Sequence, residues 1–271
     1  MKKPTVTERP TSWWREKLEQ RRTRMQNEQL SLTEPMAWSS DAERRGAIKF
    51  FNAAFRAEES GLTQAHQLAS EVDCSDPELG RVLRLYGDEE GWHRQLLTEF
   101  LAFLGGEATD MGRVTRTFYR WYARAKRMET IVLTNLMFET VGSTTYRLAL
   151  RNVQQPQARQ MLTILTRDES FHVPLNVHFL RQVLKRQPES AKRRLRRIYR
   201  LLFVSLVLLP LASRPKAKPF DGIGVLTLSR AYARELGELF ARERDLDFEP
   251  PRLLLRLLGI RLKDLGRGVQ R

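Results

Sequence analysis

The sequence predicts an all-α protein, and three observations support that prediction. Apolar residues recur at spacings of three and four over four long stretches between residues 42 and 186, which is the pattern of one buried helix face. The period-two alternation that is typical of half-buried strands is nearly absent. Capping residues, Pro and Gly stand where these stretches begin and end. We therefore expect four long helices in succession, followed by shorter ones.

The first two helices have clear boundaries. Ser40 and Asp41 can cap a helix over residues 42–70, whose apolar residues share one face. Asp76 followed by Pro77 predicts the start of a second helix, because Asp caps well and Pro suits the first helical position. The two glycines at 105 and 106 predict its end.

The remaining helices are predicted from similar signals. Asp110 can cap a third helical segment that reaches Arg151, with a break expected near 124–128. Pro156 fits the first turn of a fourth helix that ends near Arg186 and is kinked at Pro174. A further helical pattern covers residues 188–213. A connector from Arg214 to Asp221 follows it, and two shorter helical patterns cover residues 224–244 and 250–265.

These patterns divide the chain into three parts. Residues 1–40 are polar and basic and hold no apolar stripe long enough for a core, so we expect a basic N-terminal extension. Residues 41–186 contain the four long helices and form the main domain. Residues 187–271 form a C-terminal helical extension, in which a basic and then apolar helix precedes two shorter helices.

Composition bounds the class of protein. A chain of 271 residues can bury a sizeable core without disulfides or metals, and 41% hydrophobic residues with 15 Gly and 12 Pro exclude a disordered or collagenous chain. The single cysteine, Cys74, excludes an intramolecular disulfide, a thiolate zinc quartet and a Cys-ligated iron–sulfur cluster. A metal must therefore be held by carboxylate and imidazole, and we expect a reducing, cytoplasmic location.

Charge and hydropathy limit the partners. The 47 Lys and Arg residues exceed the 32 Asp and Glu residues, so the surface should attract nucleic acid, anionic lipid or an acidic protein. No groove-reading motif occurs, which argues against nucleic acid as the partner. The opening MKKPTVTERP lacks the apolar core of a secretory signal. The longest apolar stretch, Leu201–Ala212, is shorter than the about 20 residues that span a bilayer.

A doubled motif points to chemistry. Of four histidines, two stand three residues after a glutamate, as Glu90–His93 on the second predicted helix and Glu169–His172 on the fourth. A spacing of three places a carboxylate and an imidazole on one helix face, where both can reach a common metal ion. Two identical half-sites on alternate helices are not expected by chance.

A two-metal site of this type needs one more carboxylate from each of the other two helices. Glu139 lies on the apolar stripe of the third helix. The first helix offers Glu58 and Glu59, and Glu58 shares its face with Phe51 and Phe55. We therefore assign Glu58 rather than Glu59 as the ligand of the first helix.

The two halves also match in their glycines. Gly61 follows Glu58 by three residues, and Gly142 follows Glu139 at the same spacing. The chain thus contains a helix-pair repeat in which Glu is followed by Glu-x-x-His, twice. We leave the other two histidines, His66 and His178, out of the site, because neither falls on a ligand face.

With this doubled motif the chain resembles the ferritin-like di-iron carboxylate family, which includes rubrerythrins, bacterial oxygenase subunits, acyl-carrier desaturases and quinone hydroxylases. The resemblance implies that residues 41–186 form a ferritin-like four-helix bundle with additional C-terminal helices. It implies two iron ions, or a manganese and iron pair, with Glu90 and Glu169 as bridging ligands and Glu58 and Glu139 as terminal ones. The full ligand set is Glu58, Glu90, His93, Glu139, Glu169 and His172.

The resemblance implies an oxygen-dependent oxidoreductase that acts on a small organic or carrier-bound substrate by hydroxylation, N-oxygenation or desaturation. Such an enzyme needs an electron donor, such as a reductase or ferredoxin. Iron oxidation or peroxide removal is an alternative, although the Cys-x-x-Cys pairs of full-length rubrerythrins are missing. A non-catalytic basic binding module is a third.

The basic run Lys185–Arg200 abuts the apolar segment Leu201–Ala212. We expect that segment to be buried against the main domain. The alternative is a docking surface for an acidic carrier protein or a peripheral contact with a membrane.

Overall fold

The computed structural model describes residues 8–110, 116, 125, 127–213 and 223–265. Within these residues every regular element is helical and no strand occurs, which confirms the all-α prediction. The α-helices are α1 (Thr11–Met25), α2 (Asp41–Val72), α3 (Pro77–Phe103), α5 (Met128–Asn152), α6 (Pro156–Lys185), α7 (Glu189–Ser213), α9 (Val225–Arg242) and α10 (Arg252–Leu257). Two short 3-10 turns, η2 (Arg244–Leu246) and η3 (Leu262–Asp264), follow α9 and α10.

The predicted caps form. The Ser40 hydroxyl accepts a hydrogen bond from the Glu43 backbone N–H at 3.2 Å, at the start of α2. The Asp76 carboxylate accepts one from the Leu79 backbone N–H at 3.1 Å, at the start of α3. Beyond the end of α3, Gly105 has a φ of 71°, which L residues with side chains rarely adopt.

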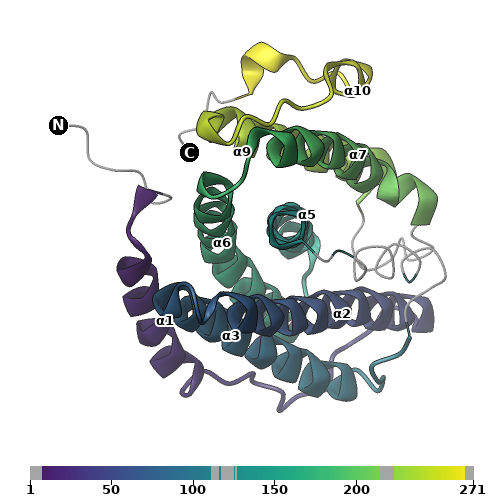
Figure 1. Ribbon diagram of the computed structural model, residues 1–271. Helices are drawn as coiled ribbons and strands as arrows, with labels where there is room; N and C mark the ends of the chain where they lie inside the picture. The colour runs from purple at the N-terminus through teal and green to yellow at the C-terminus, as the bar shows by residue number, and fades with distance from the viewer. Residues whose placement is uncertain (1–7, 111–115, 117–124, 126, 214–222, 266–271) are drawn as a thin grey trace.

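The helices pack in pairs around a central helix. α2 packs against α3, and α5 packs against α6, and the pairs meet through α2–α5 and α3–α6 contacts. Figure 1 shows α5 end-on between a lower layer of α2 and α3 and an upper layer of α7 and α9. α1 lies along α3.

The apolar core is divided into two clusters. On α2, Phe55 belongs to one cluster and Ala65 to the other; on α6, the same division falls between Leu165 and Leu175. The gap on each helix is filled by buried acidic residues and, on α3 and α6, by histidine. The fold therefore places a polar layer between two apolar ones.

The N-terminal segment differs from the prediction. Residues 1–40 were expected to contribute no core, but α1 buries Trp14 and Leu18 against the rest of the molecule. Two buried residues four positions apart are too short a pattern to stand out among the charged residues of this segment.

Two predicted helices differ in extent from the elements of the structure. The 250–265 pattern is helical only over α10 and η3, with Gly259 at a φ of 74° between them. The third predicted helix is present as α5 from Met128, which lies in the expected break. Most of its earlier part, residues 111–115, 117–124 and 126, lies outside the described residues, as does the 214–221 connector.

The apolar part of α7 is largely buried, with Leu202, Phe203 and Leu206 in the core and Leu201 and Leu211 exposed. No described helix is long and apolar enough to cross a membrane. This packing agrees with the expected burial of the segment.

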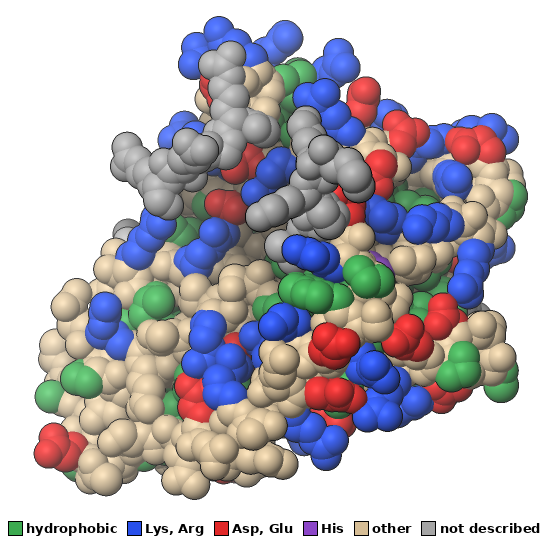
Figure 2. Space-filling view, turned by 90° about the vertical axis from the view of Figure 1, so that its left-hand side faces the viewer, with side chains coloured by type: hydrophobic (Ala, Val, Ile, Leu, Met, Phe, Trp, Pro, Cys, Tyr) green, Lys and Arg blue, Asp and Glu red, His purple; other side chains and the backbone are tan. Residues whose placement is uncertain are grey.

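The basic run is partly paired within the molecule. Arg194 bonds to Glu129, and Arg196 bonds to Glu189 and Asp247. On the face drawn in Figure 2, Lys and Arg side chains likewise lie among acidic ones.

Candidate metal centre

Four helices bring the six predicted ligands into the polar layer. Glu58 comes from α2, Glu90 and His93 from α3, Glu139 from α5, and Glu169 and His172 from α6. Both histidine side chains are 0% exposed, and Glu139 is the most exposed of the six at 11%. The predicted residues therefore converge, although they span more than a hundred positions of sequence.

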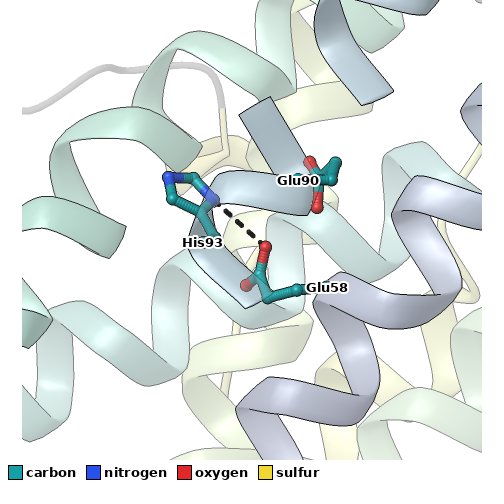
Figure 3. A group of neighbouring side chains, drawn as sticks. All are labelled: Glu58, Glu90 and His93. Atoms are coloured by element: carbon teal, nitrogen blue, oxygen red, sulfur yellow. Dashed lines mark hydrogen bonds and ion pairs between the residues drawn. The ribbon is translucent and has the colours of Figure 1, made fainter. Parts of the chain in front are cut away.

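The α2–α3 half is held together by a hydrogen bond. His93 Nδ1 lies 3.1 Å from Glu58 Oε2, as the dashed line in Figure 3 marks. Glu90 belongs to the same helix as His93, and one donor atom from each of the three residues falls within 4.8 Å of the others. This arrangement can hold one metal ion.

The α5–α6 half lacks a comparable bond. His172 Nδ1 lies 3.0 Å from Glu90 Oε1, and 3.8 Å from both Glu139 Oε2 and Glu169 Oε2. Glu90, Glu139 and His172 again bring donor atoms within 4.8 Å of one another. Because Glu90 belongs to both groups, it lies between the two halves.

The outer nitrogen of each histidine faces a carboxylate from the other motif. His93 Nε2 is hydrogen-bonded to Asp168 Oδ2 at 3.2 Å, and His172 Nε2 lies 3.4 Å from Glu89 Oε2. Outer carboxylates of this kind orient an imidazole, so that its other nitrogen is presented inward. Sequence reasoning missed both roles, although an acid directly before each motif glutamate was the available signal.

Two arginines of α1 hold these outer carboxylates. Arg21 donates from Nε to Glu89 Oε2 at 3.0 Å and from Nη2 to Asp168 Oδ1 at 2.8 Å. Arg24 Nη2 donates to the same Asp168 oxygen at 2.7 Å. Burial alone raises the pKa of Glu89, but His172 and Arg21 outweigh it and lower the pKa to about 2. α1 is therefore part of the site.

Two tyrosines donate hydrogen bonds to glutamates of the other helix pair. Tyr86 of α3 donates its hydroxyl hydrogen to Glu139 Oε1 at 2.6 Å, and Tyr146 of α5 donates to Glu58 Oε1 at 3.1 Å. Burial, together with the charge of the bonded glutamate, raises the pKa of both phenols well above the ordinary value. Both hydroxyls thus stay protonated and act as donors.

The carboxylates raise the pKa values of both histidines. Burial alone lowers the pKa of His93, but its hydrogen bonds to Asp168 and Glu58 and their charges outweigh burial and raise the pKa to about 10. Burial is outweighed in the same way at His172, whose pKa is raised by Glu90 and the other surrounding carboxylates.

Two glutamates resist ionisation in the chain alone. Burial raises the pKa of Glu90 well above its usual range, and the negative charges of Glu139 and Glu58 raise it further. Burial and the charge of Glu139 do the same for Glu169. A divalent cation reverses both effects, because positive charge favours the ionised carboxylate.

The donor set fits two metal ions. Four buried atoms at the site make no hydrogen bond of ordinary geometry, namely Glu90 Oε1, Glu169 Oε2 and both ring nitrogens of His172. Such atoms are costly to bury unless a ligand satisfies them. The four inner glutamates carry four negative charges when ionised, which two divalent cations balance. Carboxylate and imidazole ligands suit iron and manganese.

The glycine repeat has a spatial meaning in one half. A Cβ added at Gly61 would lie 2.7 Å from Glu90 Oε2, so a side chain there would displace the shared glutamate. At Gly142 the nearest atom to an added Cβ is Tyr146 Cε2 at 4.0 Å. Of the two glycines in the repeat, only Gly61 is therefore required by its contacts.

The residues left out of the prediction lie away from the site. Glu59 is 35% exposed and pairs with Arg56 on the surface, whereas Glu58 is 2% exposed. The His66 side chain is 43% exposed. His178 is buried, but it faces α1 rather than the carboxylates. Glu58 therefore lies in the buried polar layer, whereas Glu59, His66 and His178 lie outside it.

No protein-family model matches the sequence, and no curated protein or solved structure matches it either. The chemistry of the site is therefore argued from its own residues and distances.

Proposed function

We propose that this chain is a ferritin-like di-iron carboxylate protein, in which α2, α3, α5 and α6 form the four-helix bundle and the C-terminal helices are additions to it. The observation that carries the proposal is the convergence of both Glu-x-x-His motifs and two further glutamates in one buried layer. Manganese with iron is the alternative metal pair.

The chain's own residues prepare the metal centre. Glu58, Glu90, Glu139 and Glu169 supply oxygen ligands, and the inward Nδ1 atoms of His93 and His172 supply nitrogen ligands. Asp168 and Glu89 fix the two imidazoles through their Nε2 atoms. When bound, two reduced irons supply the electrons and open coordination positions that oxygen activation needs.

We infer that the reaction is the oxygen-dependent oxidation of an organic substrate. In hydroxylation, one oxygen atom of O2 enters the substrate and the other leaves as water, with two electrons from a reductase or ferredoxin and two protons. The apolar clusters on both sides of the polar layer exclude bulk water from this chemistry.

A second candidate is iron oxidation or peroxide removal. One observation favours it: among the described residues, the cavity beside Arg181 and the cavity beside Arg147 take no lining residue from the candidate metal centre. Storage or detoxification chemistry needs an iron entry route and no organic pocket, whereas an oxygenase needs a substrate channel.

The experiment begins with metal content. The purified chain is loaded with ferrous iron without oxygen, freed of excess metal and analysed for iron. We expect two ions per chain, and loss of both in the Glu90→Ala, Glu169→Ala double variant. Circular dichroism of the variant controls for folding. A wild-type protein that retains less than about half an iron ion per chain would contradict the proposal, because the donor set favours tight binding.

Oxygen uptake separates the two candidates. Excess ferrous iron is added with oxygen, and ferric iron is counted. Oxygen uptake that stops after the bound irons are oxidised, and resumes with an added electron donor, supports the oxygenase. Ferric iron that accumulates far beyond two per chain supports iron oxidation instead.

A further inference from the structure

A groove lies between α5 and α9, outside the proposed metal chemistry. Its cavity volume is about 520 Å³, within the range of small-molecule sites. One wall is a single face of α5 that includes Arg147, Leu148 and Arg151, and the opposite wall is a face of α9 that includes Arg230 and Arg234. We call this the α5–α9 groove.

The groove is separated from the metal centre by α5 itself. Arg147 and Leu148 lie eight and nine positions after Glu139, which places Leu148 about 180° around the helix axis from that glutamate. The hydrogen bond between Thr145 and Tyr232, at 2.7 Å, joins α5 to α9 beside the groove. A ligand held here would not contact the metal ligands.

The charge of the groove is unbalanced. Four arginines line it against one carboxylate, Glu235, which pairs with Arg147 at 3.0 Å. Among the described residues, no hydrogen bond or ion pair engages Arg151 or Arg230. Gathering like charges in one concave surface is unfavourable unless an anion compensates them.

The third wall is apolar. It is formed by Leu258, Gly259 and Ile260, which follow α10, and Leu148 of α5 faces the same space. Ile260 is 6% exposed and anchors this wall to the core. The groove therefore offers cationic and apolar surfaces side by side.

We propose that the α5–α9 groove binds the phosphate group of an organic phosphate whose adjoining part is apolar. Guanidinium groups match phosphate oxygens with paired, charge-assisted hydrogen bonds, and three of the four arginines have no carboxylate partner in the groove. Thr227 adds a hydroxyl at the exposed end. The apolar wall receives the carbon skeleton. The phosphate belongs either to a soluble ester or to a lipid headgroup, which the test distinguishes.

The test uses the full chain and two probes. Pyrophosphate binding is measured by isothermal titration calorimetry at low and at physiological ionic strength, and binding to vesicles of phosphatidylcholine with phosphatidic acid is measured by flotation. We expect the wild type to bind at least one probe. The Arg151→Gln, Arg230→Gln double variant should lose about tenfold or more in affinity, because both guanidiniums contact the phosphate. Thr227→Glu, which adds a carboxylate from an exposed position, should lose a similar factor.

A matched control removes the same charge elsewhere. Arg193→Gln, Arg197→Gln takes two exposed arginines from α7 and should change affinity by less than about twofold. Pyrophosphate binding identifies a soluble ligand, and binding to vesicles alone identifies a lipid. Failure of the wild type to bind either probe, or an equal loss in the α7 control, overturns the proposal.

Discussion

The two halves of the candidate metal centre are alike in sequence and different in their contacts. In the α2–α3 half, Glu58 and His93 share a hydrogen bond at 3.1 Å. In the α5–α6 half, neither His172 nor Glu169 Oε2 has a hydrogen bond of ordinary geometry. A metal ion bound in the first half would replace an existing hydrogen bond, whereas one bound in the second half would satisfy atoms that have none. A repeated motif therefore does not imply repeated energetics.

The halves are also tied to each other. Glu89 of α3 faces His172, and Asp168 of α6 bonds to His93. Tyr86 of α3 likewise bonds to Glu139 of α5. Because these contacts cross between the helix pairs, neither pair can position its own ligands alone.

The largest difference is expected between neighbouring glutamates. Glu58→Gln should lower bound iron from two ions per chain to about one and abolish oxygen-dependent turnover, because an amide replaces a charged ligand of the α2–α3 half. Glu59→Gln should keep both ions, since Glu59 pairs with surface Arg56. Iron analysis of both variants checks this. Loss of metal from Glu59→Gln, with Glu58→Gln unchanged, would show that the wrong helix face was assigned.

The contacts of α1 with Glu89 and Asp168 predict the next largest effect on iron affinity and stability. Arg21→Gln removes the closer of the two arginine partners of the buried Glu89, since Arg24 Nη2 lies 3.6 Å from Glu89 Oε1, and it removes one of the partners of Asp168. We expect iron affinity to fall about 10- to 100-fold, the range for outer-sphere contacts, and unfolding free energy to drop by about 3 kcal/mol. Competition with a chelator and urea unfolding measure the two.

Arg24→Gln is the matched control for Arg21. Its side chain is 32% exposed, compared with 14% for Arg21, and Asp168 keeps Arg21 and Arg167 as partners when Arg24 is lost. The effect should be several-fold smaller on both measurements. Equal effects of the two variants would mean that α1 acts through its total charge and not through the closer, hydrogen-bonded contact of Arg21 with Glu89.

The glycine repeat tests the same asymmetry without removing a ligand. Gly61→Ala places a methyl group 2.7 Å from Glu90 Oε2, so the shared carboxylate must turn away and iron affinity should fall several-fold. Gly142→Ala meets no close atom and should raise stability by up to about 1 kcal/mol, since Ala favours helix over Gly. Equal iron affinity in both variants would show that Glu90 moves without loss of binding.

How far the sequence leads depends on whether the signal is local. Ser40 and Asp76 mark helix starts within a few residues of the cap, so the boundaries of α2 and α3 were predicted closely. Glu90 and His93 were found because both ligands lie within one helical turn.

The contacts that were missed join distant segments. The bond between His93 and Asp168 spans 75 residues, and the bond between Arg21 and Asp168 spans 147. No periodicity within one helix encodes such a pairing. The tight approach of Glu90 to Gly61 depends on the packing of α2 on α3, so the shared glycine spacing suggested a symmetry that the contacts lack.

A third buried histidine of α6 shows what the carboxylates do for the other two. His178 lies 3.2 Å from the Thr11 hydroxyl and beside the Trp14 ring, with no carboxylate bonded to it. Burial lowers its pKa to about 4, with a further contribution from the positive charge of Arg181. His93, equally buried, has a pKa raised to about 10 by its carboxylates. The difference reflects bonding partners, not depth.

The lowered pKa of His178 predicts a contribution of this residue to the pH dependence of stability. In the unfolded chain its pKa is about 6.5, so above that pH both states are neutral and it contributes no penalty. Below pH 6.5 His178 becomes protonated in the unfolded state, whereas in the folded state it stays neutral down to about pH 4. Between these two pH values the free energy of unfolding therefore falls by about 1.4 kcal/mol for each pH unit. His178→Gln cannot gain this proton. Between pH 7.5 and 5.0, the variant should therefore become more stable relative to wild type by about 2 kcal/mol, as measured by urea unfolding of metal-free protein. Parallel pH profiles for the two proteins would show that His178 ionises equally in both states and that its burial against α1 is looser than the contacts with Thr11 and Trp14 indicate.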